Sequence, residues 1–424
     1  MEGSLSLGLG FLYCFVFFDS MRVILTSFFL FVSVLLSAQT KALKEANSLL
    51  KANKISDAEK AIDAILTDSA SKDLPEAWNL AGQIQRRIHE TENQKAYLHK
   101  KYDTLLLYNS SLRMAKYFMK CDDLAQIPDS KGKIKNKFRK ANSQYVYEER
   151  SNLINGGYYY MALEKEADRR KAIDFFDTYI ESGLHPILES YYTAAKDTLI
   201  PNVAYFACLT ALKVNDYELV SKYASYALNS NEYAQYAMEL ISTAFLQQGD
   251  SIKFLESLKE GIQKYPEDRF FFANIVDFYL KKDRIEEAMA VTNEVLSQNP
   301  NNAYNLYVKG YLFQNQEKYD EAIDTYNQAI SIDSVYAEAY SGIGLVYCIK
   351  AQDYSTQAST DINSSEYQKD QETLRSFYMK AKDAYEKARQ LRPDQKELWL
   401  NGLYRVYYNL NMGEEFNEIE SLLN

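Results

Sequence analysis

The chain has 424 residues, of which 47% are hydrophobic and 25% are charged, as is typical of a soluble globular protein. Its net charge of −10 repels phosphate backbones, so the composition argues against nucleic acid as a general partner. With 15 glycines and 7 prolines the chain has few helix breakers, which favours long helices. The four cysteines have no CxxC spacing, so we expect neither a disulfide framework nor a structural metal.

Residues 1–38 have the pattern of a leader. Met21 begins a short positive stretch, Val23–Leu36 is a mostly apolar run, and small residues follow it. This run is shorter than the ~20 residues of a membrane span, so the pattern predicts a signal peptide that starts at Met21 and is cleaved at residue 38. On this interpretation residues 1–20 are an over-extended start, and the protein is exported to the periplasm or cell envelope. The alternative is a membrane hairpin anchor formed by Leu5–Phe18 and Val23–Leu36.

Residues 39–200 show a degenerate pattern of helix pairs. A single apolar face within 41–66 is formed by Ala58, Ala61, Ile62, Ile65 and Leu66. Further helices are expected at 75–88, about 95–120, 141–160 and 167–181. Gly156 and Gly157 fit a site of close helix packing better than a phosphate-binding loop.

A basic run lies at 131–140, where six of ten residues are Lys or Arg. One interpretation is a patch for an anionic partner or a membrane surface. We favour a solvated connector, because one basic run within an acidic chain is weak evidence for a site.

From residue 201 onward the sequence repeats with a period of 34. Pro266 and Pro300 are 34 residues apart, and blocks that begin at 201, 235, 269, 303 and 337 align. Two positions of the expected second helix recur as small or apolar residues: Val220, Phe254, Ala288 and Ala322, and seven residues later Ala227, Gly261, Val295 and Ala329. This period predicts an array of helix–turn–helix repeats over 201–424. The second helix of the fifth block arrives late, so we expect an insertion at about 351–375, and residues 416–423 suit a C-terminal capping helix.

The block 303–336 resembles a tetratricopeptide repeat (TPR). The family's small and aromatic positions are matched by Gly310, Ala322, Tyr326 and Ala329. Two positions depart from the pattern, since Lys309 stands where an apolar residue is usual and Ser334 replaces the closing proline. The resemblance is clear over 201–424 and weaker as far as residue 41. It implies an all-α fold, a TPR-like right-handed superhelical solenoid of antiparallel helix pairs.

In such a solenoid the first helix of each pair lines a concave groove. Tyrosine supplies a large rigid contact area with a polar handle, which suits a peptide or protein segment as partner. The predicted groove residues are Tyr304, Tyr307, Tyr311, Gln314, Tyr236, Glu239, Phe270 and Asp277. Tyr205 falls at a comparable position of a neighbouring first helix. The alternative is that these tyrosines pack between adjacent repeats, because aromatic residues at helical spacing are common in cores.

The search for catalytic motifs is negative. The sequence contains no GxGxxG, P-loop, GxSxG or HExxH pattern. His89, His99 and His185 lack the spacing of a helical metal pair and are expected on the surface. Cys208 occupies a small-residue position of its repeat and is expected to be a buried packing residue. We therefore predict no catalytic residue, no metal and no cofactor.

The leading hypothesis is a non-catalytic, exported protein–protein interaction scaffold. The alternative is a glycan-binding component of a cell-envelope uptake system, in which exposed aromatic rings stack on sugars. Against it, Trp78 and Trp399 both fall at structural positions of the repeats. An enzyme that uses carboxylates of the insertion is a third hypothesis, but the sequence shows no positioned base, nucleophile or cofactor.

Overall fold

The structure is a computed structural model that describes residues 40–423 except 70, 129–130, 135 and 192–196. The predicted signal peptide, its cleavage point and the alternative hairpin anchor lie outside the described residues. The described chain contains helices, turns and no strand, which confirms the all-α class. None of its helices has both the length and the apolarity to cross a membrane.

The chain divides into two compact units, of which the first ends at Ser257 and the second begins at Leu258. After a helix at 40–51, the first unit contains α2 (Ile55–Thr67), α3 (Pro75–Tyr97), α4 (Thr104–Ala125), α5 (Arg139–Met161), α6 (Glu166–Leu184), η1 (Pro186–Leu188), α7 (Ile200–Lys213), α8 (Tyr217–Ala227) and α9 (Ala234–Gln247). The division falls within α10 (Ser251–Lys264). The predicted domain boundary at residue 200 stays a prediction.

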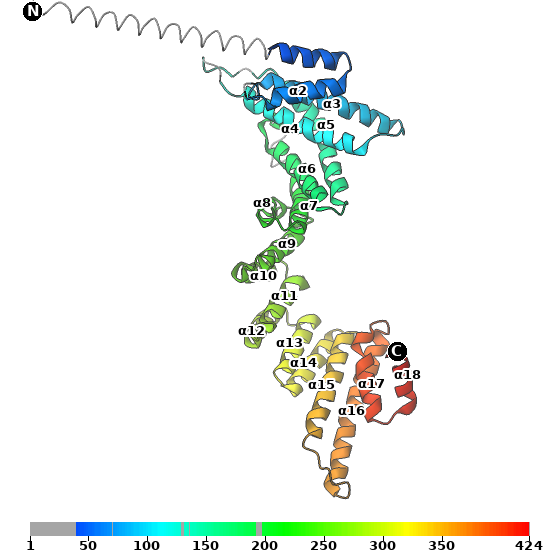
Figure 1. The fold of residues 1–424 in the computed structure, drawn as a ribbon. Helices are drawn as coiled ribbons and strands as arrows, with labels where there is room; N and C mark the ends of the chain where they lie inside the picture. Colours follow the sequence, from blue (N-terminus) through cyan, green and yellow to red (C-terminus); the bar gives the residue numbers. More distant parts are fainter. Residues whose placement is uncertain (1–39, 70, 129–130, 135, 192–196, 424) are drawn as a thin grey trace, which may run out of the picture. The chain divides into compact units, whose positions relative to one another are not determined.

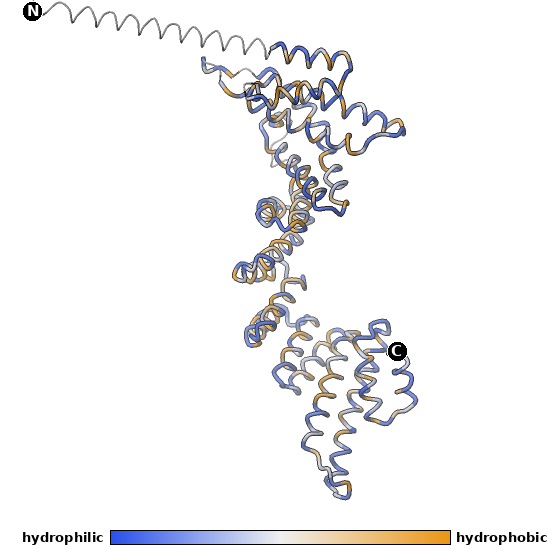
Figure 2. The backbone as a smooth tube through the Cα atoms, viewed as in Figure 1, coloured by the Kyte–Doolittle hydropathy of each residue, from blue (hydrophilic) through white to orange (hydrophobic). Residues whose placement is uncertain are grey.

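The second unit contains α11 (Arg269–Leu280), α12 (Ile285–Gln298), α13 (Ala303–Asn315), α14 (Tyr319–Ile332), α15 (Ala337–Ser355), α16 (Ser365–Leu391), η3 (Lys396–Leu398), α17 (Leu400–Asn409) and α18 (Gly413–Leu423). Successive helices pack on one another in both units, which confirms the predicted solenoid of helix pairs (Figure 1). Apolar and polar residues alternate along these helices, as expected of helices that bury one face (Figure 2).

The first helices of most pairs end in the same backbone turn. At Glu317 the φ angle is 61°, and the next residue, Lys318, donates its backbone N–H to the carbonyl of Phe313 at 2.9 Å, as in a Schellman motif. Positive φ recurs at 34-residue spacing at residues 215, 249, 283 and 317, and also at 53, 99 and 411. The period predicted from side chains is therefore also a period of the backbone.

A buried aromatic ring fills the space between consecutive first helices. Tyr326 of α14 is 1% exposed and lies between Gly310 of α13 and Gly342 of α15. A Cβ atom added at either glycine would lie 2.7 Å from the ring. Tyr385 of α16 is held in the same way by Gly344. Gly310, Gly342 and Gly344 are thus the small residues that allow these helices to approach closely.

The segment predicted as an insertion lengthens both helices of its pair. Helix α15 continues to Ser355, residues 356–364 form the connection, and α16 begins at Ser365. Buried Asp370 fixes the connection, since it accepts hydrogen bonds from the Tyr354 hydroxyl at 2.7 Å and the Ser359 N–H at 2.8 Å. The insertion is therefore an ordered helical extension rather than a long free loop.

Candidate functional site

Two of the predicted groove tyrosines are half buried by neighbours in the second unit. The Tyr304 ring lies 4.6 Å from the guanidinium carbon of Arg269. The Tyr307 ring contacts Tyr326 at 5.7 Å and Tyr336 at 5.5 Å between ring centroids. Burial raises the pKa of both Tyr304 and Tyr307. At these two positions the structure favours packing between helices, the alternative that the sequence left open.

The predicted groove residues nearer the C-terminal end of α13 differ in their exposure. Tyr311 is 39% exposed, and Leu345, at the equivalent position of α15, is 38% exposed. Gln314 is half buried, and its side-chain oxygen accepts a hydrogen bond from the Tyr326 hydroxyl at 3.1 Å. Tyr311 and Leu345 thus offer apolar contact area on successive first helices, while Gln314 is held by the core.

Phe270 and Asp277 lie on α11, the preceding first helix of the same unit. Phe270 is half buried, with its ring 5.3 Å from that of Phe271. Asp277 is exposed and forms an ion pair with Lys281, one turn later, at 2.6 Å. This pair lies in solvent, so it contributes little to stability and leaves the carboxylate accessible.

Tyr236 and Glu239 lie on α9 in the first unit. The Tyr236 ring is 49% exposed and lies 6.4 Å from that of Tyr205. Tyr205 stacks on Tyr233 at 4.6 Å, with an angle of 5° between the rings. Burial, together with the charge of Glu239, raises the pKa of Tyr205. The other six predicted residues belong to the second unit, so one groove formed by all eight stays a prediction.

The first unit carries a larger group of rings than the sequence indicated, here called the aromatic cluster. The ring of Phe206 lies 4.9 Å from that of Tyr158 and 5.4 Å from that of Tyr233. Helices α5, α7 and α9, with the residue before α9, supply its five members: Tyr158, Tyr205, Phe206, Tyr233 and Tyr236. The 34-residue register missed Tyr158 and Tyr233 because both lie outside the first helices of the array. The spacing of Tyr233 and Tyr236, three residues apart, was the available signal.

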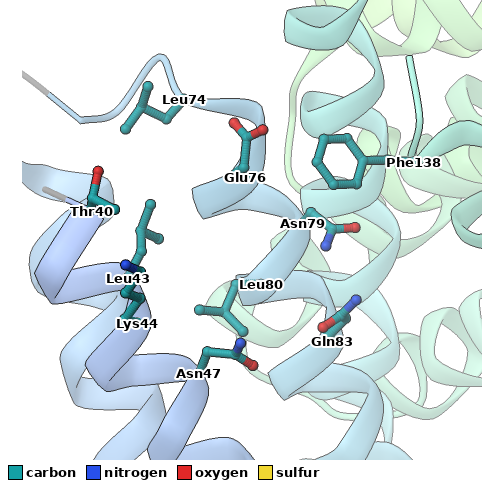
Figure 3. Close-up of a pocket in the computed structure, with 10 residues that line it drawn as sticks. All are labelled: Thr40, Leu43, Lys44, Asn47, Leu74, Glu76, Asn79, Leu80, Gln83 and Phe138. Atoms are coloured by element: carbon teal, nitrogen blue, oxygen red, sulfur yellow. The ribbon is translucent and has the colours of Figure 1, made fainter. Parts of the chain in front are cut away.

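A cavity of about 400 Å³ lies at the N-terminal end of the first unit. Figure 3 shows helix 40–51 on one side and α3 on the other, with Phe138 at the edge. Apolar side chains and amides line it together, and the charged groups are Lys44 and Glu76. This mixture can hold part of a peptide, but it places no reactive group in the cavity. The sequence did not predict this cavity, because residues far apart in the chain form it.

His89 is not on the surface, so that expectation was wrong. It is 1% exposed, with Nε2 2.8 Å from a carboxylate oxygen of Glu149 and Nδ1 3.0 Å from the carbonyl of Leu107. Burial lowers the pKa of His89, but the hydrogen bond and the charge of Glu149 outweigh it and raise the pKa above its usual value. Both ring nitrogens face acceptors, so the imidazolium satisfies them best. Packing of α3 against α4 and α5 creates this ion pair. Helical periodicity in the sequence cannot predict it, because the partner lies on another helix.

The reactive side chains of the described residues are engaged in the core or in ion pairs. Cys121, Cys208 and Cys348 are buried, and burial raises the pKa of the Cys208 thiol to about 12. Such a thiol stays protonated at neutral pH and is a poor nucleophile. His185 pairs with Asp123 at 3.0 Å. Across the parts of the chain that the structure describes, no three His, Cys, Asp or Glu side chains converge as metal ligands.

Comparisons with solved structures give weak global likeness. MamA is 17% identical with a TM-score of 0.32, and the match covers 45% of this chain and 90% of MamA. The TPR domain of P58(IPK) is 16% identical with a TM-score of 0.31, covering 88% and 98%. The C-terminal part of a TPR repeat-containing protein from Cytophaga hutchinsonii is 12% identical with a TM-score of 0.38, covering 65% and 92%. Since these TM-scores are below 0.5, no property is carried over from these structures.

The sequence comparison is more informative. A search of curated protein sequences found no match. A family model described as a TPR repeat matches residues 310–348, which extend from Gly310 in α13 through α14 into α15. This segment contains the Tyr326 ring and both glycines against which it packs. The family model thus identifies a TPR repeat at residues 310–348.

Proposed function

We propose that the chain is a non-catalytic protein–protein interaction scaffold that binds a peptide or protein segment on aromatic side chains of its first unit. The TPR match supports the scaffold role, since stacked helix pairs present extended binding surfaces. The observation that carries the finer proposal is the aromatic cluster. Its rings contact one another at 4.6 to 6.4 Å, while Tyr158 is 37% and Tyr236 is 49% exposed.

The cluster is prepared for binding because its rings already hold one another in place. Stacking of Tyr205 on Tyr233 limits the freedom of both side chains before a partner arrives. Binding to ordered rings loses less side-chain entropy than binding to mobile ones. Tyr158 and Tyr236 are the two rings with most surface to offer.

The surroundings of the cluster define the kind of segment that fits. The Glu232 carboxylate lies near Tyr158 and Tyr233, and its effect contributes to the raised pKa of both hydroxyls. The charge of Glu239 acts on Tyr205 and, after burial, contributes to the raised pKa of its hydroxyl. Aromatic faces flanked by carboxylates suit a segment that combines apolar side chains with Lys or Arg, because a cation gains both from the carboxylates and from the rings.

Site-specific photocrosslinking tests this proposal. A benzophenone amino acid at position 236 should capture a discrete partner from envelope extract, whereas the same group at Tyr147, which is 44% exposed and outside the cluster, should not. The captured segment, made as a peptide, should bind the Tyr158→Ser/Tyr236→Ser variant about tenfold or more weakly than the parent. Equal capture at both positions, or no capture at either, would contradict the proposal.

Export is part of the proposal and is supported by the leader sequence alone. N-terminal sequencing of the chain recovered after expression with its own leader should give a start at residue 39. A chain that keeps Met21 and the apolar run would favour the anchored alternative.

Glycan binding is the second candidate, and the same exposed rings favour it. Tyr158 and Tyr236 could stack on sugar rings next to the Glu232 carboxylate. The two tryptophans are less suited to bind a sugar, because their indole N–H groups are already hydrogen bonded within the protein. Trp399 donates to the Arg392 carbonyl at 3.0 Å, and Trp78 donates to the Lys72 carbonyl at 2.6 Å. Binding on a glycan array that is lost in Tyr158→Ser/Tyr236→Ser, without any crosslinked peptide, would select this candidate.

A further inference from the structure

The turn between α3 and α4 exposes several large apolar side chains close together. The sequence predicted helix over about 95–120, but α3 ends at Tyr97 and α4 begins at Thr104. Figure 1 shows this turn as the projecting tip of a long hairpin in the first unit. The turn patch consists of Tyr97, Leu98, Tyr102, Leu105 and Leu106, which are between 40% and 83% exposed. Exposed apolar groups of this kind mark interaction surfaces.

The turn is firmly built, so this exposure is a property of an ordered structure. His99 has a φ of 53°, and Lys100 donates its N–H to the Lys95 carbonyl at 2.9 Å, which closes α3. The Asp103 side chain accepts the N–H of Leu106 at 2.9 Å and caps α4. The apolar side chains are thus held outward by a closed helix end on one side and a capped helix start on the other.

Cations outnumber carboxylates among the exposed charges of the turn, where Lys100 and Lys101 lie beside the exposed Asp103. Glu92 is 5% exposed and turned inward, where it binds Lys95 at 2.6 Å and the Asp103 N–H at 2.9 Å. Lys100 and Lys101 are exposed beside the apolar side chains. In a chain of net charge −10 this is a local positive surface, complementary to an anionic one.

We propose that the turn patch rests on an anionic lipid bilayer. Tyrosine rings favour the headgroup level, leucines enter the acyl boundary, and lysines extend to lipid phosphates. A projecting tip suits a planar surface better than it suits a peptide, which needs a groove. In this contact the apolar side chains enter only the headgroup and acyl boundary, so the turn lies on the membrane surface. The surface is separate from the aromatic cluster and independent of its partner.

A fluorescent probe at the patch tests the proposal on the full-length chain. The variant Tyr97→Cys is labelled with an environment-sensitive dye in a Cys14→Ser background, where Cys121, Cys208 and Cys348 are buried. Vesicles of phosphatidylcholine with phosphatidylglycerol should raise and blue-shift the emission, and phosphatidylcholine alone should do so much less. The same dye at Tyr408→Cys, 67% exposed in the second unit, should stay unchanged.

Charge variants give the second measurement. The double variant Lys100→Gln/Lys101→Gln should lower the affinity for vesicles, measured with the probe at position 97, by about tenfold or more. The matched control, Lys281→Gln/Lys282→Gln, alters an exposed lysine pair that directly follows α11 and should bind like the parent.

Three results would overturn the proposal. The first is an equal response of the probes at positions 97 and 408. The second is binding of the protein to vesicles without any change in the emission of the probe at position 97, which would mean that another segment makes the contact. The third is an emission change that follows protein concentration without vesicles, which would identify the patch as a protein contact.

Discussion

Replacement of Gly342 by alanine should destabilise the second unit through Tyr326. Gly342 lies in α15 and faces the buried Tyr326 ring of α14. The new Cβ would lie 2.7, 2.8 and 3.1 Å from three ring carbons. The ring cannot move away from the new methyl group, because its other side is packed equally closely against Gly310. A Cβ atom added at Gly310 would also lie 2.7 Å from the ring. One added methyl group therefore has to move a helix rather than a flexible side chain.

Two terms of opposite sign set the size of the effect. Overpacking in a well-packed core costs about 1–3 kcal/mol. Alanine within a helix gains roughly 0.5–1 kcal/mol over glycine. We expect the free energy of unfolding of the second unit to fall by about 1–2 kcal/mol. In a Tyr326→Ala background the clash is absent, so the same Gly342→Ala change should stabilise by about 0.5–1 kcal/mol.

Urea denaturation followed by tryptophan fluorescence measures these changes. Trp399 is buried in the second unit, and a Trp78→Phe background leaves it as the reporter. Gly413→Ala is the matched control, since its Cβ would meet no atom within 4 Å. If Gly342→Ala is as stable as the parent while Tyr326 is present, the reasoning about close packing is refuted.

Three further predictions concern the backbone and the buried charges. Glu317→Gly should stabilise the second unit by about 0.5–1 kcal/mol in urea, because glycine accepts the positive φ of 61° without strain; an unchanged midpoint would contradict this. Removal of the buried Asp197 carboxylate by Asp197→Ala should cost about 3–5 kcal/mol, because the buried charge of Arg150 loses the carboxylate that compensates it at 2.7 Å; a loss below about 1 kcal/mol, as for an exposed pair, would show that the pair is solvated. The raised pKa of His89 means that its contribution to stability is full below the unfolded pKa of about 6.5 and is lost as pH rises through the higher folded pKa, so urea midpoints of the first unit should fall as the pH is raised above about 6.5. This decline should be absent in His89→Gln, and an equal decline in that variant would assign it to another group.

Much of the fold could be predicted because its signals are local. The 34-residue period placed first-helix starts at 201, 235, 269, 303 and 337, and the structure has them at 200, 234, 269, 303 and 337. Each helix pair repeats the same small residues and the same turn, so the pattern can be read within one block. The buried state of Ala322, Ala329 and Cys208 followed from the same register.

The candidate site was less predictable, because exposure depends on which helix lies opposite. Tyr304 and Tyr311 share one face of α13, yet Tyr304 is covered by Arg269, whereas Tyr311 stays 39% exposed. The helical period gives the face of a residue but not the neighbour that covers it. For the same reason the sequence listed two members of the aromatic cluster, Tyr205 and Tyr236, and could not show which other rings join them.

The all-α class, the helix pairs and the small residues that let them approach could be read from the sequence, because these are properties of segments shorter than one repeat. Tertiary structure alone decided which polar and apolar groups are covered. The His89–Glu149 pair joins α3 to α5, and its partners are 60 residues apart in the chain. The exposure of Tyr97 follows from a hairpin tip that no other described helix of the first unit covers. Burial depends on contacts between segments that are distant in the sequence, so the pattern of apolar residues within one helix cannot predict it.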